Sequence, residues 1–262
     1  MYQRHIIDPT TRLADFRGRC ALAVMAKAPK PGSVKTRLSP PLNPEQAAAL
    51  NIAFLRDTIA CLQEVATIVD GVPVISYTPI GAEREFDGII ADNVMLLPQR
   101  GAGFGERLHG TVEDLLSAGF CAVCLIDSDS PTVPREAYVE AVDRLLSGED
   151  CAVLGPSQDG GYYLLGVNAP HPRLFTDIIW SSAAVFEQTL ERAQSIDLPV
   201  HSLPTWFDVD DGQTLGRLFR ELVGPHRPRG AFAAEHTKRY LQTIADGPET
   251  VPGRPYAQRG AG

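Results

Sequence analysis

The hydrophobic positions of the chain fall into short apolar runs that alternate with longer segments of helical periodicity. The apolar runs predict strands at residues 20–27, 72–78, 93–99, 120–126, 151–157, 161–167 and 200–204. The periodic segments predict helices at about 43–65, 135–147, 183–193, 213–222 and 231–245. A further helix is predicted to follow the loop at 100–108 and to end at about 117. Strands that alternate with helices are typical of βαβ units. The pattern therefore predicts an α/β fold with a mainly parallel central sheet flanked by helices.

The longest predicted helix carries a clear start signal. Asn43 suits the N-cap, Pro44 the first helical position and Gln46 the third, which together predict a capping box. No linker divides the chain, so we expect one domain at 20–246. Residues 1–19 are expected to form an extended arm. The end, 247–262, is rich in Pro and Gly and has little to bury, so we expect a disordered tail.

Composition and charge remove several functional classes. The 262 residues are 44% hydrophobic, which allows a sizeable core. The formal net charge of −8 argues against a nucleic-acid binder, which usually carries a basic surplus. No apolar run reaches the roughly 18 residues that a membrane span needs, so we expect no membrane segment and no signal peptide.

The cysteines indicate a reducing compartment. Their odd count, five, without an export signal is typical of free thiols, so we expect a cytoplasmic protein. Cys121 and Cys124 form a C-x-x-C pair inside an apolar run, with no second pair and no nearby His. Residues three apart on a strand point to opposite faces, so we interpret the pair as core packing.

A basic loop follows the first predicted strand. It contains four cationic residues, Lys27, Lys30, Lys35 and Arg37. Pro and Gly residues between them restrict the shape of the loop, and clustered cations suit phosphate groups. The loop is no Walker A motif because it has no Gly-Lys pair. A solvated loop without a ligand is the alternative.

Two clusters of carboxylates follow apolar segments. Asp127 and Asp129 come directly after the strand at 120–126, and Asp208, Asp210 and Asp211 follow Trp-Phe late in the chain. Paired carboxylates suit Mg²⁺ or Mn²⁺, which prefer oxygen ligands and often share them with substrate phosphates. The alternative is an Asp that caps a following helix, and this explains Asp211 best.

The basic and acidic loops are expected to meet at one edge of the sheet. Open α/β sheets bind ligands beyond the carboxyl ends of their strands. A divalent cation bridged to a diphosphate would satisfy both kinds of charge there. We therefore predict a metal and phosphate site at this edge.

Two glycine-containing loops are candidates for the walls of that site. The loop at 101–107 includes Gly103, but Glu106 stands where a dinucleotide fingerprint needs its third Gly. The other loop holds Asp159, Gly160, Gly161 and Tyr162. Its glycines would let the backbone approach a ligand while Asp159 accepts hydrogen bonds from hydroxyl groups. An ordinary Asp-Gly hairpin turn is the alternative for this loop.

Four segments together resemble a known bacterial family. They read AVMAKAPKPGSVKTRLSPPL, LIDSDSP, GPSQDGGYYLLGV and DVDDGQTL, and they span residues 20–222. The chain resembles glycosyltransferase-like proteins that are labelled as transferases associated with radical-SAM and selenocysteine domains or with arsenosugar biosynthesis. This family is similar in fold to the nucleotide-diphospho-sugar transferases, the glycosyltransferase-A superfamily. The resemblance therefore implies a single Rossmann-like domain of this type with an additional C-terminal helix.

The resemblance also implies roles for individual residues. Asp129 looks like the metal ligand of a D-x-D element, with Asp127 near the ribose or sharing the metal, and Asp210 looks like a second acidic ligand. The phosphate-binding residues would be Lys27, Lys35 and Arg37. The wall of the sugar or acceptor site would be Asp159, Gly160 and Gly161. Family members tend to have an acidic residue where this chain has Gly103, so the resemblance leaves any contact from that loop open.

Three functions are compatible with these features. The first is metal-dependent glycosyl transfer from a nucleotide-diphospho-sugar to a small acceptor, with Asp159 a candidate base. The second is nucleotidyl transfer from a nucleoside triphosphate to a phosphorylated acceptor, because KTRLSPPL and DVDD also resemble 2-phospho-L-lactate guanylyltransferase and the molybdenum-cofactor nucleotide transferases. The third is a non-catalytic nucleotide-binding module, which the cost of clustered charge disfavours.

Overall fold

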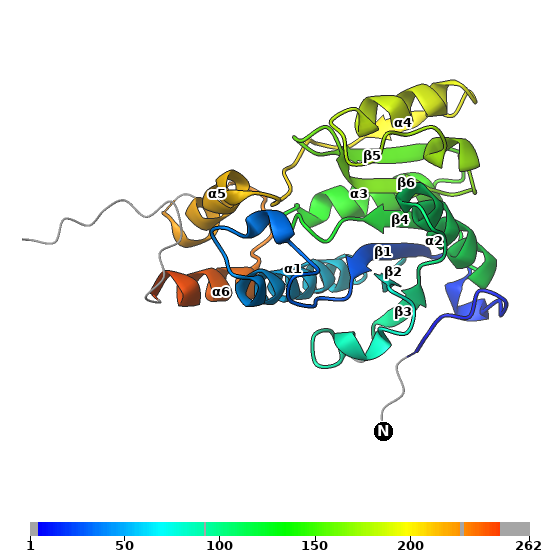
Figure 1. The fold of residues 1–262 in the computed structure, drawn as a ribbon. Helices are drawn as coiled ribbons and strands as arrows, with labels where there is room; N and C mark the ends of the chain where they lie inside the picture. The colour runs from blue at the N-terminus through cyan, green and yellow to red at the C-terminus, as the bar shows by residue number, and fades with distance from the viewer. Residues whose placement is uncertain (1–4, 92, 226–227, 247–262) are drawn as a thin grey trace, which may run out of the picture.

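The structure, a computed structural model, describes residues 5–91, 93–225 and 228–246. Its centre is a seven-stranded sheet with helices on both faces (Figure 1). The predicted tail at 247–262 and the first four residues of the predicted arm lie outside the described residues. The α/β fold with a mainly parallel sheet is confirmed.

Every predicted strand is present in the sheet. The strands are β1 (Cys20–Lys27), β2 (Gly71–Thr78), β3 (Met95–Pro98), β4 (Ala122–Ile126), β5 (Ala152–Pro156), β6 (Tyr162–Val167) and β7 (Val200–Ser202). Their order across the sheet is β3-β2-β1-β4-β6-β5-β7. β6 is antiparallel to β4 and β5, and the other neighbouring pairs are parallel. The start of β6 therefore lies at the same edge as the ends of β1, β4 and β5.

Helices cover both faces of this sheet. The α-helices are α1 (Pro44–Val65), α2 (Phe104–Ala118), α3 (Arg135–Leu146), α4 (Val185–Gln194), α5 (Gly212–Val223) and α6 (Glu235–Asp246). One core cluster joins α1 and α3 to one face of β1 and β4, and a second joins α2 to the opposite face. A third cluster packs α5 and α6 against the first half of α1. Four short 3₁₀ turns complete the elements: η1 (Ala14–Phe16), η2 (Thr36–Leu38), η3 (Glu83–Phe86) and η4 (Pro172–Phe175).

Two predicted helix caps are confirmed. The Asn43 side chain accepts a hydrogen bond from the Gln46 backbone N–H, and the Gln46 side chain accepts one from the Asn43 N–H. Asp211 caps α5 in the same way, since its Oδ1 accepts from the Thr214 N–H at 2.8 Å. These bonds satisfy N–H groups that the first turn of a helix leaves without partners.

The segment at 5–19 packs on the sheet edge beside β3. Ile6 bridges to Leu96, and Ile7 is buried. Phe16 stacks on Phe120 with ring centroids 4.1 Å apart. This apolar contact holds the segment against the end of α2 and the start of β4. The boundary between an arm and a domain at residue 20 stays a prediction.

The C-x-x-C pair divides between core and surface. The Cys124 thiol is buried 3.8 Å from that of Cys20, whereas Cys121 is exposed and accepts a hydrogen bond from the Gly18 N–H. The prediction of core packing is therefore wrong for Cys121, because β4 begins one residue after it. Within the described ranges, no helix has the length and apolarity needed to cross a bilayer.

Candidate active site

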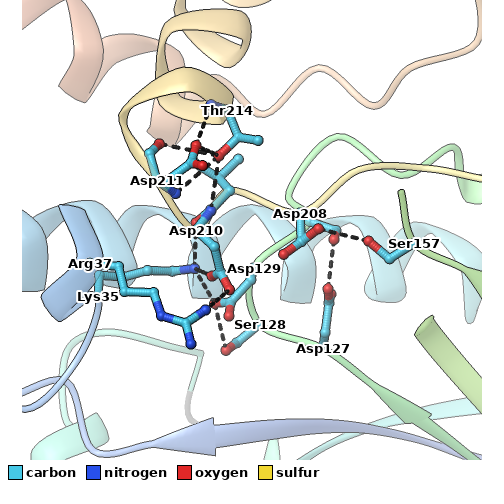
Figure 2. A network of polar contacts seen from close by, with 12 residues as sticks. Lys35, Arg37, Asp127, Ser128, Asp129, Ser157, Asp208, Asp210, Asp211 and Thr214 are labelled. Carbon is cyan, nitrogen blue, oxygen red and sulfur yellow. Dashed lines mark hydrogen bonds and ion pairs between the residues drawn. The ribbon is translucent and has the colours of Figure 1, made fainter. Parts of the chain in front are cut away.

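Lys35 occupies the centre of the charged edge of the sheet. Its ammonium donates to the Val209 carbonyl at 2.6 Å and lies 2.9 Å from Asp129 Oδ1 and 3.0 Å from Asp210 Oδ1 (Figure 2). Only 5% of the side chain is exposed. Burial works to lower the pKa of this ammonium, but the two carboxylates outweigh it, so the pKa of Lys35 is raised. Lys35 is thus a charged, internal cation.

Asp129 and Asp210 reach this cation from distant parts of the chain. Asp129 follows β4, and Asp210 ends the extended segment before α5. The Val209 N–H donates to the Asp129 carbonyl at 3.0 Å, so the two segments are also joined through their backbones. Arg37 lies 3.7 Å from Asp210 and is largely exposed. The two carboxylates therefore converge on the Lys35 ammonium.

Two further aspartates lie beside this pair, and burial favours the uncharged form of both carboxyl groups. Burial, followed by the nearby charge of Asp129, raises the pKa of Asp127 well above its usual range, although the Ser130 hydroxyl donates to it at 2.6 Å. Burial also raises the pKa of Asp208, which accepts from the Ser157 hydroxyl at 2.7 Å. A cation bound near these two carboxyl groups would favour their ionised form.

Two cavities meet at the Asp129–Asp210 pair. The larger has a volume of about 570 Å³ and the smaller about 270 Å³, and both are lined by Arg37, Asp129 and Asp210. The smaller cavity is lined by the basic loop, including Lys27 and Lys35. Arg37 is the single Lys or Arg among the described residues that line the larger cavity, whereas five aspartates line it: Asp127, Asp129, Asp159, Asp208 and Asp210.

Most of the predicted site residues lie around these cavities. The cavity walls include Lys27, Lys35, Arg37, Asp127, Asp129, Asp159, Gly161, Tyr162 and Asp210. Lys30 lies elsewhere, 3.0 Å from Glu85, and Gly103 is the N-cap of α2 outside both linings. These positions do not test the roles of the residues, which stay proposals.

The loop of Asp159 is both a hairpin and a cavity wall. It joins β5 to β6, and Asp159 Oδ1 accepts from the Gly161 N–H at 2.8 Å. Gly160 has a φ of +92°, and a Cβ there would lie 2.1 Å from the Ala183 carbonyl oxygen. Only glycine therefore fits where this hairpin meets the segment before α4. The loop can therefore be an ordinary hairpin turn and also form part of the cavity wall.

Several cavity residues were missed by the sequence reasoning. Asp208 belongs to the acidic run that the sequence analysis noted, and Phe104 follows Gly103 directly, so both had a signal. Trp180 and the residues after it line the larger cavity but carry no charge pattern. Asn51 lines the smaller cavity from α1 and is 4% exposed, and its Oδ1 has no hydrogen-bond partner among the described residues. The one feature of the sequence that could have indicated Asn51 is that it is a polar residue on an apolar face of the helix.

The donor set is compatible with a divalent metal ion that also binds phosphate. No group of three or more Asp, Glu, His or Cys side chains in the described part of the chain is arranged to hold a metal. Mg²⁺, however, commonly takes one or two carboxylates and completes its shell with water and substrate phosphates. The convergence of Asp129 and Asp210 on the Lys35 ammonium provides two such oxygen ligands around one cation position.

Comparisons with known proteins agree with the fold. A family model described as an uncharacterized protein conserved in bacteria (DUF2064) matches residues 61–182. A crystal structure from Desulfovibrio desulfuricans G20, provisionally named a nucleotide-diphospho-sugar transferase, is 28% identical with a TM-score of 0.71. It covers 87% of this chain and 98% of its own. A search of curated proteins finds no match.

Two other solved structures are less similar to this chain. The 4-diphosphocytidyl-2C-methyl-D-erythritol synthase of Anaerococcus prevotii DSM 20548 is 9% identical with a TM-score of 0.50, covering 76% of this chain and 95% of its own. Glucosyl-3-phosphoglycerate synthase of Mycobacterium tuberculosis, solved with Mn²⁺, UDP and glucosyl-3-phosphoglycerate, is 14% identical with a TM-score of 0.43. It covers 78% of this chain and 77% of its own, and a likeness this low has no bearing on the reaction. The subtype associated with radical-SAM domains or arsenosugars has no support among these matches.

Proposed function

We propose that this protein is a metal-dependent transferase that moves a glycosyl group from a nucleotide-diphospho-sugar to a small acceptor. The observation that carries the proposal is the convergence of Asp129 and Asp210 on one cation position between a basic and an acidic cavity. The 28% identity to the protein from D. desulfuricans supports the same class of donor.

The smaller cavity suits the diphosphate of the donor. Lys27 is exposed and has no ion-pair partner in the described residues, and Lys35 and Arg37 line the same space. Asp129 and Asp210 would hold Mg²⁺ or Mn²⁺ at its boundary, with phosphate oxygens as the remaining ligands. A bound divalent ion supplies Lewis-acid stabilisation of the departing diphosphate. The Lys and Arg side chains add positive charge where negative charge develops on the leaving group.

The larger cavity suits an uncharged sugar and an uncharged acceptor. Arg37 is the single Lys or Arg among the described residues of its lining, and it already lies 3.7 Å from Asp210, so a phosphorylated acceptor would find little free positive charge there. Hydroxyl groups, in contrast, donate hydrogen bonds to carboxylates. Asp159 lines this cavity and would accept a proton from an acceptor hydroxyl as that oxygen attacks the anomeric carbon and the diphosphate leaves. This charge distribution favours glycosyl transfer over nucleotidyl transfer.

Ligand-induced stabilisation separates the two reactions. Melting temperatures would be measured with nucleoside diphosphates, nucleotide-diphospho-sugars and nucleoside triphosphates, each with and without Mn²⁺. A ligand at a hundredfold excess over its Kd adds about 2.7 kcal/mol of stability. We expect the largest Mn²⁺-dependent shift with a diphospho-sugar, and release of the nucleoside diphosphate when an acceptor is supplied. Pyrophosphate release from a triphosphate would establish nucleotidyl transfer instead, and no shift with any nucleotide would overturn both.

A pair of variants tests the position of the metal. Asp129→Ala removes one of the two converging carboxylates and should abolish the Mn²⁺ dependence of ligand binding. Asp150→Ala is the matched control, because Asp150 pairs with His171 away from both cavities at 2.8 Å. Full Mn²⁺ dependence in Asp129→Ala would remove that residue from the site.

A further inference from the structure

The larger cavity combines its carboxylates with an aromatic wall. Trp180 and Phe104 both line it, with ring centroids 5.3 Å apart and the rings edge to face. Phe104 is 44% exposed, and Trp180 is half-buried. Leu108 and Val185 continue the apolar surface. This part of the lining has no role in binding metal or phosphate.

The indole of Trp180 is held by close packing against α2. A Cβ at Gly105 would lie 2.6 Å from Trp180 Nε1 and 2.7 Å from the Phe175 carbonyl oxygen. The first turn of α2 can therefore approach the indole this closely only because residue 105 is a glycine. The next residue along the backbone, Ser181, has a φ of +62°, which few non-glycine residues adopt. The ring is therefore positioned before any ligand arrives.

The segment that carries Trp180 is also anchored on its other side. The Ile179 N–H donates to the Gln188 side chain at 2.8 Å, and the Gly160 carbonyl accepts from the Phe186 N–H at 2.9 Å. Ala183 packs against Gly160 so closely that a Cβ there would overlap it. The hairpin of Asp159 and the segment that carries Trp180 therefore pack against each other as one continuous surface.

A sugar ring matches this combination of groups. Its hydroxyl groups donate hydrogen bonds to carboxylates such as Asp159 and Asp208, while the axial C–H groups of one face form an apolar surface that fits an aromatic ring. Ligand sites generally pair apolar and aromatic walls with a few placed polar groups. A phosphate or a carboxylate ligand would gain nothing from Trp180 and would be repelled by the aspartates.

We propose that Trp180 is a specificity-determining residue that binds the apolar face of the donor's sugar ring. The inference rests on the proposed glycosyl transfer and adds which part of the donor the larger cavity recognises. The nucleoside diphosphate alone occupies the smaller cavity and does not reach Trp180. The sugar, attached beyond the Asp129–Asp210 pair, covers the indole.

Fluorescence can follow this contact directly, because the sequence contains only two tryptophans. The second, Trp206, donates to the Thr132 hydroxyl at 3.1 Å and lines neither cavity. Trp206→Phe therefore leaves Trp180 as the reporter, and Trp180→Phe is the matched control that leaves Trp206. The probes are UDP, GDP and dTDP with their glucose or mannose conjugates, each with Mn²⁺. We expect the sugar conjugate that binds to change the emission of Trp180, the diphosphate alone to leave it unchanged, and neither to affect the control.

Affinity measurements provide a test that does not depend on emission. Trp180→Ala should weaken binding of the diphospho-sugar about tenfold and that of the diphosphate less than about twofold, as expected for one aromatic contact. Trp180→Phe should retain part of the affinity. Ile179→Ala is the matched control, because Ile179 is 64% exposed and lines neither cavity.

The outcomes separate this inference from the proposed function. Equal loss of affinity for diphosphate and diphospho-sugar in Trp180→Ala would overturn the role of Trp180 while glycosyl transfer stands. The role of Trp180 would also be overturned if a folded Trp206→Phe variant bound a diphospho-sugar and the emission of Trp180 did not change. If no diphospho-sugar binds the wild-type chain, the proposed function fails and the inference with it.

Discussion

The Lys35 ammonium lies 3.0 Å from the Asp210 carboxylate, across 175 positions of sequence. It also contacts Asp129, so this lysine fills the position at which two candidate metal ligands converge (Figure 2). An internal cation at this point repels a second one. Binding of a divalent ion is therefore expected to require a phosphate ligand that draws the Lys35 ammonium away and supplies further oxygen ligands.

Lys35→Met should raise the affinity for Mn²⁺ in the absence of nucleotide by roughly tenfold or more, because it removes the positive charge that lies between the two proposed metal ligands, Asp129 and Asp210. The same substitution should weaken binding of a nucleoside diphosphate. Titration of free Mn²⁺ by electron paramagnetic resonance measures the first effect and calorimetry the second. Lys30→Met provides the comparison, because Lys30 pairs with Glu85 instead. Unchanged Mn²⁺ affinity in Lys35→Met would show that the ammonium does not compete with the metal.

The neighbours Asp210 and Asp211 should respond in opposite ways to replacement by alanine. Asp211 caps α5, so Asp211→Ala should lower the free energy of unfolding by about 1 kcal/mol and leave Mn²⁺-dependent binding intact. Asp210→Ala should abolish that binding without removing the cap. Urea unfolding and thermal shifts with ligand would be measured on both variants. Loss of ligand binding in Asp211→Ala, at temperatures where it is folded, would contradict this division.

Asn51→Leu should weaken binding of a nucleoside diphosphate without destabilising the fold. The Asn51 carboxamide lines the smaller cavity and has a buried oxygen with no partner in the described residues, so a ligand group that donates a hydrogen bond would complete it. One such bond is worth about 1 kcal/mol, or roughly fivefold in affinity. Thr58→Val is the control on the same helix, since Thr58 Oγ1 is likewise buried without a partner in the described residues but lines neither cavity. Equal affinities for the two variants would remove Asn51 from the site.

Tyr77→Phe should make the protein less sensitive to acid. The Tyr77 hydroxyl donates to Glu83, and this bond is the main cause that lowers the pKa of Glu83 below its usual 4.5. A lowered folded pKa stabilises the protein above the unfolded value, and this contribution is lost as pH falls through the folded value. The decrease in melting temperature from pH 7 to pH 3 should therefore be smaller in the variant. Tyr240→Phe, which removes a hydroxyl bonded to the Gln46 carbonyl, should keep the wild-type decrease; an identical decrease in Tyr77→Phe would contradict the prediction.

The strands were predictable because each is an apolar run between polar segments. β1 matches its predicted range in full, since buried strands of a mainly parallel sheet are apolar on both faces. The direction of β6 was less clear, because an apolar run does not show which way a strand runs. Cys121 was misplaced for a related reason, since periodicity locates the end of a strand only to within a residue or two.

Charge located the site only coarsely. The basic and acidic loops do meet, as expected from their places after β1 and β4. The sequence did not distinguish Lys35 from Lys30. The Lys35 backbone is in the left-handed region and its side chain is buried, whereas the Lys30 side chain is exposed. Trp180 was missed because its position in the cavity wall depends on Gly105 and Gly160, which are distant in sequence and leave space for the segment around Trp180 by having no side chain.

The two proposed metal ligands, Asp129 and Asp210, belong to different layers of the molecule. Asp129 extends from the sheet, whereas Asp210 precedes the helical unit of α5 and α6 that packs on α1. The family match at 61–182 includes Asp129 but neither Lys35 nor Asp210. A protein recognised through that range alone can share the scaffold and lack the proposed chemistry, so Lys35 and Asp210 are the positions at which the proposed site should be looked for in other chains.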